Sequence, residues 1–161
     1  VKTKEIAPQR IYFDELIDEI LYEIVKAKPI SHIKIHTRID KHLYVETDVA
    51  LLKVILSNLL NNAIDYQPQY ANTHAAKIQI DIQPVRMITP KDYSVQISII
   101  DNGIGIESSV REKIFDMFFK GSLQSKGIGL GLYEAKLAVN RLGGEIGYDL
   151  QPQQTTFWVR V

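Results

Sequence analysis

The chain has 161 residues, with 19 basic and 19 acidic side chains and no cysteine. This length suits a single domain, and the missing cysteine excludes a disulfide scaffold and a cysteine-based zinc site. The balanced charge argues against nucleic acid as a partner, because binding to a phosphate backbone usually needs a surplus of Lys and Arg. No apolar run approaches the roughly 20 residues of a membrane helix, and no signal-peptide pattern opens the chain, so we expect a soluble, cytoplasmic domain.

The first half of the chain predicts two helices and a strand hairpin. Apolar residues at helical spacing indicate a helix over residues 12–27, which ends before Pro29. Residues 33–39 alternate between apolar and polar, and residues 43–46 follow a turn at Asp40, so we expect two short paired strands. Asp48 is a good N-cap for a long helix over residues 49–66.

The second half predicts further strands and two more helices. After a loop over 67–75, the pattern predicts strands over 78–82 and 95–99 joined by a loop over 86–93, helices over 108–115 and 129–142, and strands over 145–149 and 156–161. Helices and hairpins mix without strict strand–helix–strand alternation. We therefore expect an α+β fold, a two-layer sandwich whose mixed, mostly antiparallel sheet carries helices on one face.

Glycine is unevenly distributed. All nine glycines fall between Gly103 and Gly147, and the 102 residues before them contain none. Glycine allows positive φ and close approach of the backbone to a ligand, so the second half is a candidate for a site built from main chain. Plain turns explain the same distribution equally well, and we expect Gly143, Gly144 and Gly147 to mark a helix stop and a strand turn.

The long helix carries a stripe of polar residues. Asn58, Asn62 and Tyr66 recur every four positions beside an apolar stripe, so both amides lie at the margin of the core. Asparagine is costly to bury without partners, and its side-chain oxygen is a hard, neutral ligand suited to Mg²⁺. Capping of neighbouring loops and ligand binding are both open explanations.

The first glycine segment, Asp101-Asn-Gly103-Ile-Gly105-Ile106, follows a strand directly. A carboxylate at a strand end can accept a hydrogen bond from an amino group, while residues without side chains let the backbone close around a flat ring. The spacing fits neither a calcium-binding EF-hand loop nor a dinucleotide-binding Rossmann loop. The pattern alone is also compatible with a simple turn.

The second glycine segment precedes an apolar helical run and contains Lys126, Gly127, Gly129, Gly131 and Leu132. Glycines at a helix start leave N–H groups free at the positive end of the helix dipole, which suits phosphate. The segment is not a Walker A loop, because Lys126 stands where that pattern requires glycine. The preceding residues 115–122 suit a hinged cover, although we expect Phe115 and Phe118 to pack in the core.

Together these segments resemble the ATP-binding domain of sensor histidine kinases, which has the Bergerat fold and belongs to the ATPase superfamily of gyrase, MutL and the large heat-shock chaperones. The resemblance covers roughly residues 12–161. Its motifs occur in the family's order: residues 58–66 look like the N box, 101–105 the G1 box, 115–119 the F box, 127–132 the G2 box and 155–157 the closing strand.

The resemblance implies a role for each motif residue. Asn62 would bind Mg²⁺ with support from Asn58, and Asp101 would accept the adenine amino group of ATP with help from Thr156. The remaining implied roles fall into three groups: packing on the ring or shaping its pocket (Tyr66, Gly103, Gly105, Ile106), receiving phosphate (Gly127, Gly129, Gly131, with Leu132 beside them), and contacting the γ-phosphate (Lys120, with Lys126 as a second candidate). Residues 116–126 would form a lid over the nucleotide.

The chain departs from the family pattern in three places. Asp65 stands where many relatives carry Lys, so a carboxylate could repel the nucleotide there, and Gln154 stands where a glycine is common. No His is followed by Glu or Asp, so the phosphoacceptor motif of a dimerisation helix is absent. We therefore expect residues 1–161 to be one ATP-binding catalytic domain, with the phosphoacceptor domain upstream or on another polypeptide.

Two functions follow from the resemblance. Hydrolytic relatives have a Glu as general base where this chain has Asn58, which favours phosphoryl transfer to a partner's histidine over hydrolysis. The implied partners are the protein's own dimerisation helices and a response regulator, in a full-length homodimer that is cytoplasmic or the cytoplasmic part of a membrane-bound sensor. The alternative is a non-catalytic nucleotide-binding or interaction module that regulates a partner kinase.

Overall fold

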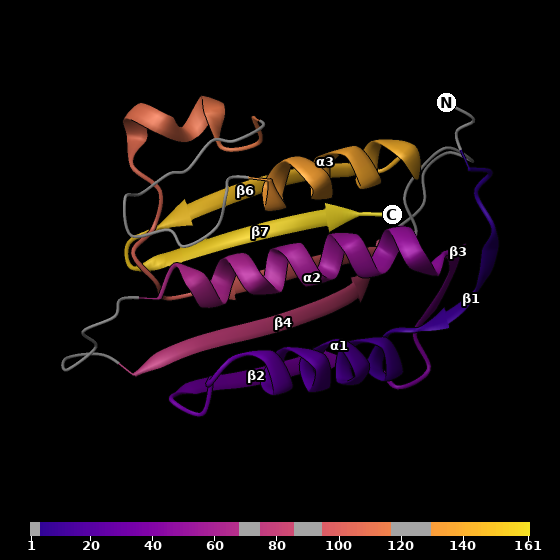
Figure 1. Ribbon diagram of the computed structural model, residues 1–161, viewed down its shortest axis with the longest axis horizontal. Coiled ribbons are helices and arrows are strands. Elements are labelled where there is room, and N and C mark those ends of the chain that lie inside the picture. The colour runs from indigo at the N-terminus through magenta and orange to yellow at the C-terminus, as the bar shows by residue number, and fades with distance from the viewer. Residues whose placement is uncertain (1–3, 68–74, 86–94, 117–129) are drawn as a thin grey trace.

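The computed structural model describes residues 4–67, 75–85, 95–116 and 130–161, and within them the chain forms two layers (Figure 1). The elements in chain order are β1 (Pro8–Tyr12), α1 (Phe13–Ala27), β2 (Ile33–Ile39), β3 (Tyr44–Asp48), α2 (Val49–Asp65), β4 (Ala76–Pro84), β5 (Val95–Asp101), the 3₁₀ helix η1 (Ser108–Lys113), α3 (Gly131–Arg141), β6 (Glu145–Gln151) and β7 (Gln154–Arg160).

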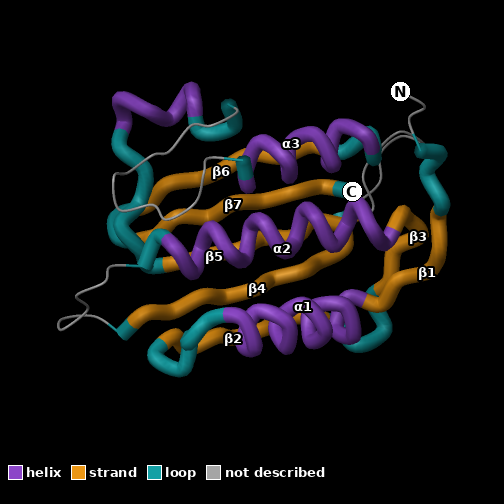
Figure 2. Tube along the Cα trace, viewed as in Figure 1, coloured by secondary structure: helices purple, strands orange, loops and turns teal. Residues whose placement is uncertain are grey.

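The main sheet has the strand order β2-β4-β5-β7-β6. The pair β2 and β4 is parallel, and the other neighbours are antiparallel. The helices α1, α2 and α3 lie side by side on one face of this sheet (Figure 2). The expected α+β sandwich with a mixed, mostly antiparallel sheet and helices on one face is confirmed.

The core lies between the helices and the sheet. In β5 the side chains alternate, so that Val95, Ile97 and Ile99 are buried against the helices while the residues between them are half-buried on the opposite face. The apolar stripe of α2 supplies the central contacts, and its members are fully or almost fully buried: Leu52, Ile55, Leu56, Leu59, Leu60, Ala63 and Ile64. Burial of each large aliphatic side chain contributes about 1.5–3 kcal/mol, so this stripe fixes α2 on the sheet.

The predicted hairpin of residues 33–39 and 43–46 is wrong, although both strands form. β2 pairs in parallel with β4, while β3 pairs with β1, a strand that the sequence pattern does not predict. The turn between β2 and β3 is present, because the Leu43 N–H donates to the Asp40 carbonyl at 3.0 Å. It carries the chain from the main sheet to a separate two-stranded ribbon of β1 and β3.

Asp48 caps α2 as predicted, and it also holds β1. One carboxylate oxygen accepts the Leu51 N–H at 3.1 Å, and the other accepts the Ala7 N–H at 3.0 Å. These backbone hydrogen bonds, with that from Ala7 the largest cause, hold the pKa of Asp48 below its usual value. The N-terminus of α2 and residues 7–12 are therefore fastened to the same side chain.

The remaining predictions for the second half have mixed outcomes. α3 begins at Gly131, and Gly143, with φ of +70°, ends it as expected. Gly147 was expected at a strand turn, and this is wrong: it lies inside β6, where the ring of its partner Trp158 covers the space that a side chain would occupy. The loop over 86–93 and most of 67–75 fall outside the described residues.

None of the helices in the described ranges is both long enough and apolar enough to span a bilayer.

Candidate functional site

Asn58, the first residue of the polar stripe of α2, faces the start of α3. Asn58 donates from Nδ2 to the Val54 carbonyl at 2.9 Å and to Glu134 Oε2 of α3 at 3.4 Å. Gly131 opens α3, and a Cβ at this position would lie 3.2 Å from Asn58 Oδ1. The missing side chain of Gly131 therefore lets the first turn of α3 approach Asn58, and the structure brings the predicted asparagine and glycine motifs together.

Asp101 lies at the other end of the site, as the last residue of β5. Its side chain is enclosed, with 4% of the residue exposed, and Oδ1 accepts the Gly103 N–H at 2.9 Å. Burial raises the pKa of Asp101 to about 6, and the hydrogen bond from Gly103 opposes that rise. A buried carboxylate at a strand end is a strong acceptor for a ligand that offers an N–H group.

The glycines after Asp101 let the loop close on the end of α2. The Ile104 N–H donates to the Tyr66 carbonyl at 3.0 Å. A Cβ on Gly103 would lie only 2.5 Å from that same carbonyl oxygen, and Gly105 has φ of +76°. Both positions therefore need glycine, and the loop joins Asp101 to the helix that carries Asn62.

Thr155, and not Thr156, lies on the side of the sheet that Asp101 faces. In the register of β5 and β7, Asp101 pairs with Thr155, whereas Thr156 pairs with Ile100 and points to the opposite face. Thr155 is buried, with 4% exposed, and its hydroxyl lies near Gly105. The expected place of Thr156 beside Asp101 is thus corrected to Thr155. The alternation with the buried Phe157 in the same strand is the signal that identifies it.

Two other predicted site residues are partly buried against the hydrophobic core, namely Ile106 and Leu132. Phe115 packs edge-on against Phe157, with ring centroids 6.3 Å apart, which confirms its expected place in an aromatic cluster. The predictions for Lys120, Lys126, Gly127, Gly129 and Phe118 fall outside the described residues.

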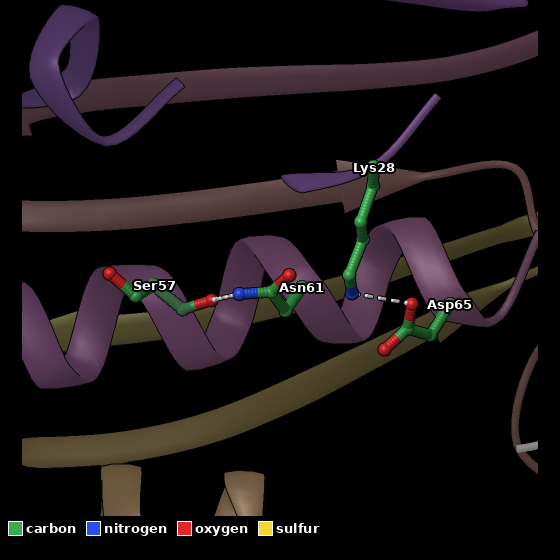
Figure 3. Close-up of polar contacts among 4 residues, drawn as sticks. All are labelled: Lys28, Ser57, Asn61 and Asp65. Atoms are coloured by element: carbon green, nitrogen blue, oxygen red, sulfur yellow. Dashed lines mark hydrogen bonds and ion pairs between the residues drawn. The ribbon is translucent and has the colours of Figure 1, made fainter. Parts of the chain in front are cut away.

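Asp65, the residue that departs from the family pattern, forms an ion pair. Lys28 Nζ, just beyond the end of α1, donates to Asp65 Oδ1 at 2.9 Å (Figure 3). The two residues are 37 positions apart, and no pattern in the sequence predicts their contact. Glu134 likewise carries no signal in the sequence that would place it beside Asn58.

The candidate site residues along α2 fall into two chemically different groups, one around Asp101 and one around Asn58. The Asp101 end offers a buried anionic acceptor beside a loop without side chains. The Asn58 end offers neutral amide oxygens and one carboxylate, a set of hard oxygen donors that fits Mg²⁺. Such an arrangement can bind a flat amino-bearing ring at one end and a metal-bound anion at the other.

Comparison with known proteins identifies the family. The model of the histidine kinase-, DNA gyrase B-, and HSP90-like ATPases matches residues 47–161. The sensor histidine kinase AruS of Pseudomonas aeruginosa is 32% identical over 115 residues, which are 68% of this chain and 11% of AruS. The sensor protein CiaH of Streptococcus pneumoniae is 31% identical over 145 residues, which are 87% of this chain and 30% of CiaH. The chain thus spans less than a third of the length of these relatives.

Solved structures agree in fold. The catalytic domain of the histidine kinase ThkA superposes with a TM-score of 0.75 at 26% identity, covering 96% of this chain and 97% of that chain. Full-length ShkA, solved in complex with AMPPNP, has the same fold, with a TM-score of 0.76 at 20% identity over 98% of this chain and 31% of ShkA. The chain therefore belongs to the family of histidine kinase-, DNA gyrase B- and HSP90-like ATPases and has the fold of a histidine kinase catalytic domain.

Proposed function

We propose that residues 1–161 form one catalytic domain that binds ATP with Mg²⁺ and transfers the γ-phosphoryl group to a histidine on a separate dimerisation domain. The observation that carries this proposal is the buried Asp101, enclosed by the Gly103 loop at the end of the helix that bears Asn62. Adenine offers an exocyclic amino group to such a carboxylate. Thr155, buried and paired with Asp101 in the strand register, offers a hydroxyl to the same ring.

The triphosphate would extend from Asp101 along α2 toward Asn58 and Gly131. Asn62 would hold Mg²⁺ with its amide oxygen, and the metal supplies neutralisation of phosphate charge. The N-terminus of α3 adds N–H groups and the positive end of its dipole. Lys120, Lys126, Gly127 and Gly129 are proposed as further phosphate contacts on the resemblance alone.

The reaction needs little chemistry from this chain. An imidazole nitrogen of the acceptor histidine attacks the γ-phosphorus, a P–N bond forms, and the bond to the bridging oxygen breaks with its electron pair leaving on ADP. The Asn58 side chain cannot take a proton at neutral pH, so it cannot act as a general base for water. This favours transfer to a nucleophile that needs no such base over hydrolysis. The chain's task is to hold the nucleotide and balance its charge.

The first experiment is nucleotide titration of the chain. We expect ATP to bind more tightly with Mg²⁺ than without it. Asn62→Asp should change the ratio of the ATP affinities measured with and without Mg²⁺. A chain that binds no ATP, or binds it without regard to Mg²⁺ and to Asn62→Asp, would contradict the kinase proposal. Glu134→Gln serves as a companion variant, because the Glu134 carboxylate accepts from Asn58 at 3.4 Å. Release of inorganic phosphate from ATP should stay low in both the wild-type chain and Glu134→Gln.

The second experiment adds a dimerisation domain and follows labelled phosphate. Acid-labile, base-stable phosphate on histidine is the expected product, and passage to a response regulator would be the next step in a two-component pathway. Tight ATP binding with no transfer to any histidine would instead support the regulatory nucleotide-binding module. The pairing of Asp65 with Lys28 removes one reason for favouring that alternative, because the carboxylate is not left uncompensated.

A further inference from the structure

The ion pair between Lys28 and Asp65 lies beside the proposed nucleotide site. Asp65 is the last residue of α2 and follows Asn62 by three positions, which places their Cβ atoms about 5–6 Å apart on neighbouring parts of the helix surface. The next residue, Tyr66, contacts the loop that follows Asp101. Lys28 reaches α2 from the end of α1, and Figure 3 shows its ammonium group directed at Asp65, with Asn61 one turn earlier on the same helix.

Stability gives little reason for this arrangement. A carboxylate in the last turn of a helix faces the negative end of the dipole, and the last turn of α2 contains no basic residue. Both side chains are partly exposed, at 35% for Lys28 and 26% for Asp65, and such pairs typically stabilise a fold only slightly. Lys28 thus neutralises the unfavourable charge of Asp65 at the end of α2, while the pair adds little to the free energy of folding.

The pair has a clearer consequence for a bound polyphosphate. Asp65 alone would add a negative charge within a screening length of phosphates held at Asn62. With Lys28 in contact, the pair is neutral, and an ammonium group that donates one hydrogen bond to Asp65 keeps two N–H donors for a second acceptor. The α1–β2 connection, a segment far from the glycine motifs in the sequence, thereby contributes a cation near the site.

We propose that Lys28, positioned by Asp65, supplies positive charge to the phosphate-binding end of the nucleotide site. This charge makes the chain favour nucleotides with more phosphate groups. This inference rests on the proposed function and adds to it a residue that the sequence motifs do not contain. Lys28 acts on affinity for the phosphate tail, and the ring contacts of Asp101 are independent of it.

The test compares ATP with adenosine, each titrated into the 161-residue chain. Lys28→Met should weaken ATP binding by about fivefold, the effect of one charge contact near water, and leave adenosine binding unchanged. Lys28→Arg should retain the preference for ATP. Raising the salt concentration should reduce the difference between the wild-type chain and Lys28→Met, because added ions screen the contact.

Lys53 provides a matched control. It also joins α2 to α1, through an ion pair of 2.5 Å with Glu19, and it has the same exposure of 35% as Lys28. It lies nine residues before Asn62, about 13 Å away along the helix axis. Lys53→Met removes the same charge from the same helix pair, so we expect its ratio of ATP to adenosine affinity to equal that of the wild-type chain.

The outcomes separate this inference from the proposed function. Equal losses for ATP and adenosine in Lys28→Met, no loss for either, or an equal effect of Lys53→Met would overturn the role of Lys28 while ATP binding by the wild-type chain still stands. A wild-type chain that binds neither compound would overturn both. Thermal unfolding of each variant shows whether that variant still folds. If Lys28→Met does not fold, the ratio of ATP to adenosine affinity in Lys28→Arg decides whether Lys28 has the proposed role.

Discussion

Replacement of Asp101 by Asn should make the free domain more stable at neutral pH while it weakens ATP binding. Burial raises the pKa of Asp101 from its usual 3.8 to about 6, so at pH 7 the folded chain carries an ionised carboxylate that its surroundings disfavour. A rise of this size corresponds to about 3 kcal/mol of folding free energy. Asn keeps an oxygen that can accept the Gly103 N–H, so the principal change is the removed charge.

The direction of the Asp101 pKa shift determines the pH range over which the two proteins differ in stability. Because the folded pKa of Asp101 lies above the unfolded value, the folded state binds the proton more tightly, and its advantage is complete below about pH 4 and lost as the pH rises through 6. Asp101→Asn should therefore match the wild-type chain in stability near pH 4 and exceed it by up to about 3 kcal/mol at pH 7.5. Other groups titrate in both proteins, so their effects cancel in the difference.

Urea unfolding of both proteins at four pH values between 4.5 and 7.5, paired with ATP titration at pH 7.5, measures both effects. Loss of a charged acceptor should weaken ATP binding by at least about tenfold. A stability difference that does not change with pH would refute the argument from burial. Unchanged ATP affinity would refute the assignment of adenine to Asp101, whatever the stability shows.

Four substitutions test other contacts of the site and the sheet. Gly103→Ala should destabilise the chain by about 1–3 kcal/mol, because its Cβ would lie 2.5 Å from the carbonyl oxygen of Tyr66, and an unchanged urea midpoint would contradict this. Thr155→Val should weaken ATP binding by about fivefold, the value of one hydrogen bond. Thr156→Val, on the opposite face of the sheet, should leave the ATP affinity unchanged. A larger loss of affinity in Thr156→Val than in Thr155→Val would restore the original expectation for Thr156. Gly147→Ala should displace the ring of Trp158, the only tryptophan, and shift its fluorescence emission with no effect on ATP affinity, so an unaltered spectrum would count against the packing of that ring.

The sequence patterns predict local structure well and strand partners poorly. The cap at Asp48 and the apolar stripe of α2 are confirmed because both depend on neighbours within a few residues. The predicted partner of β2 is wrong because an alternating pattern identifies a strand but does not indicate which strand it pairs with. The actual partner, β4, pairs in parallel and is separated from β2 in the sequence by the whole of α2. β1 escapes prediction because four of its five residues are exposed and it begins with Pro8, so it carries no alternating core pattern.

The same distinction applies to the candidate site. Asp101 with its glycines can be identified from spacing, and so can Thr155 once the alternation of β7 is followed from Phe157. The contact of Glu134 with Asn58 spans 76 positions, and it depends on the packing of α3 against α2. Contacts of this kind require the tertiary structure, because neither partner shares a local pattern with the other.

The two hydrogen bonds of the Asp48 carboxylate have a mechanical consequence. Its two oxygens hold the Ala7 N–H and the first turn of α2, so residues 7–12 and the helix that bears Asn62 share one attachment point. A pull on the β1–β3 ribbon that lengthens the bond to Ala7 acts on the carboxylate that starts α2. Movement of the ribbon therefore reaches the first turn of α2 by two routes, through this carboxylate and through the chain itself, because β3 ends at Asp48 and α2 begins at the next residue.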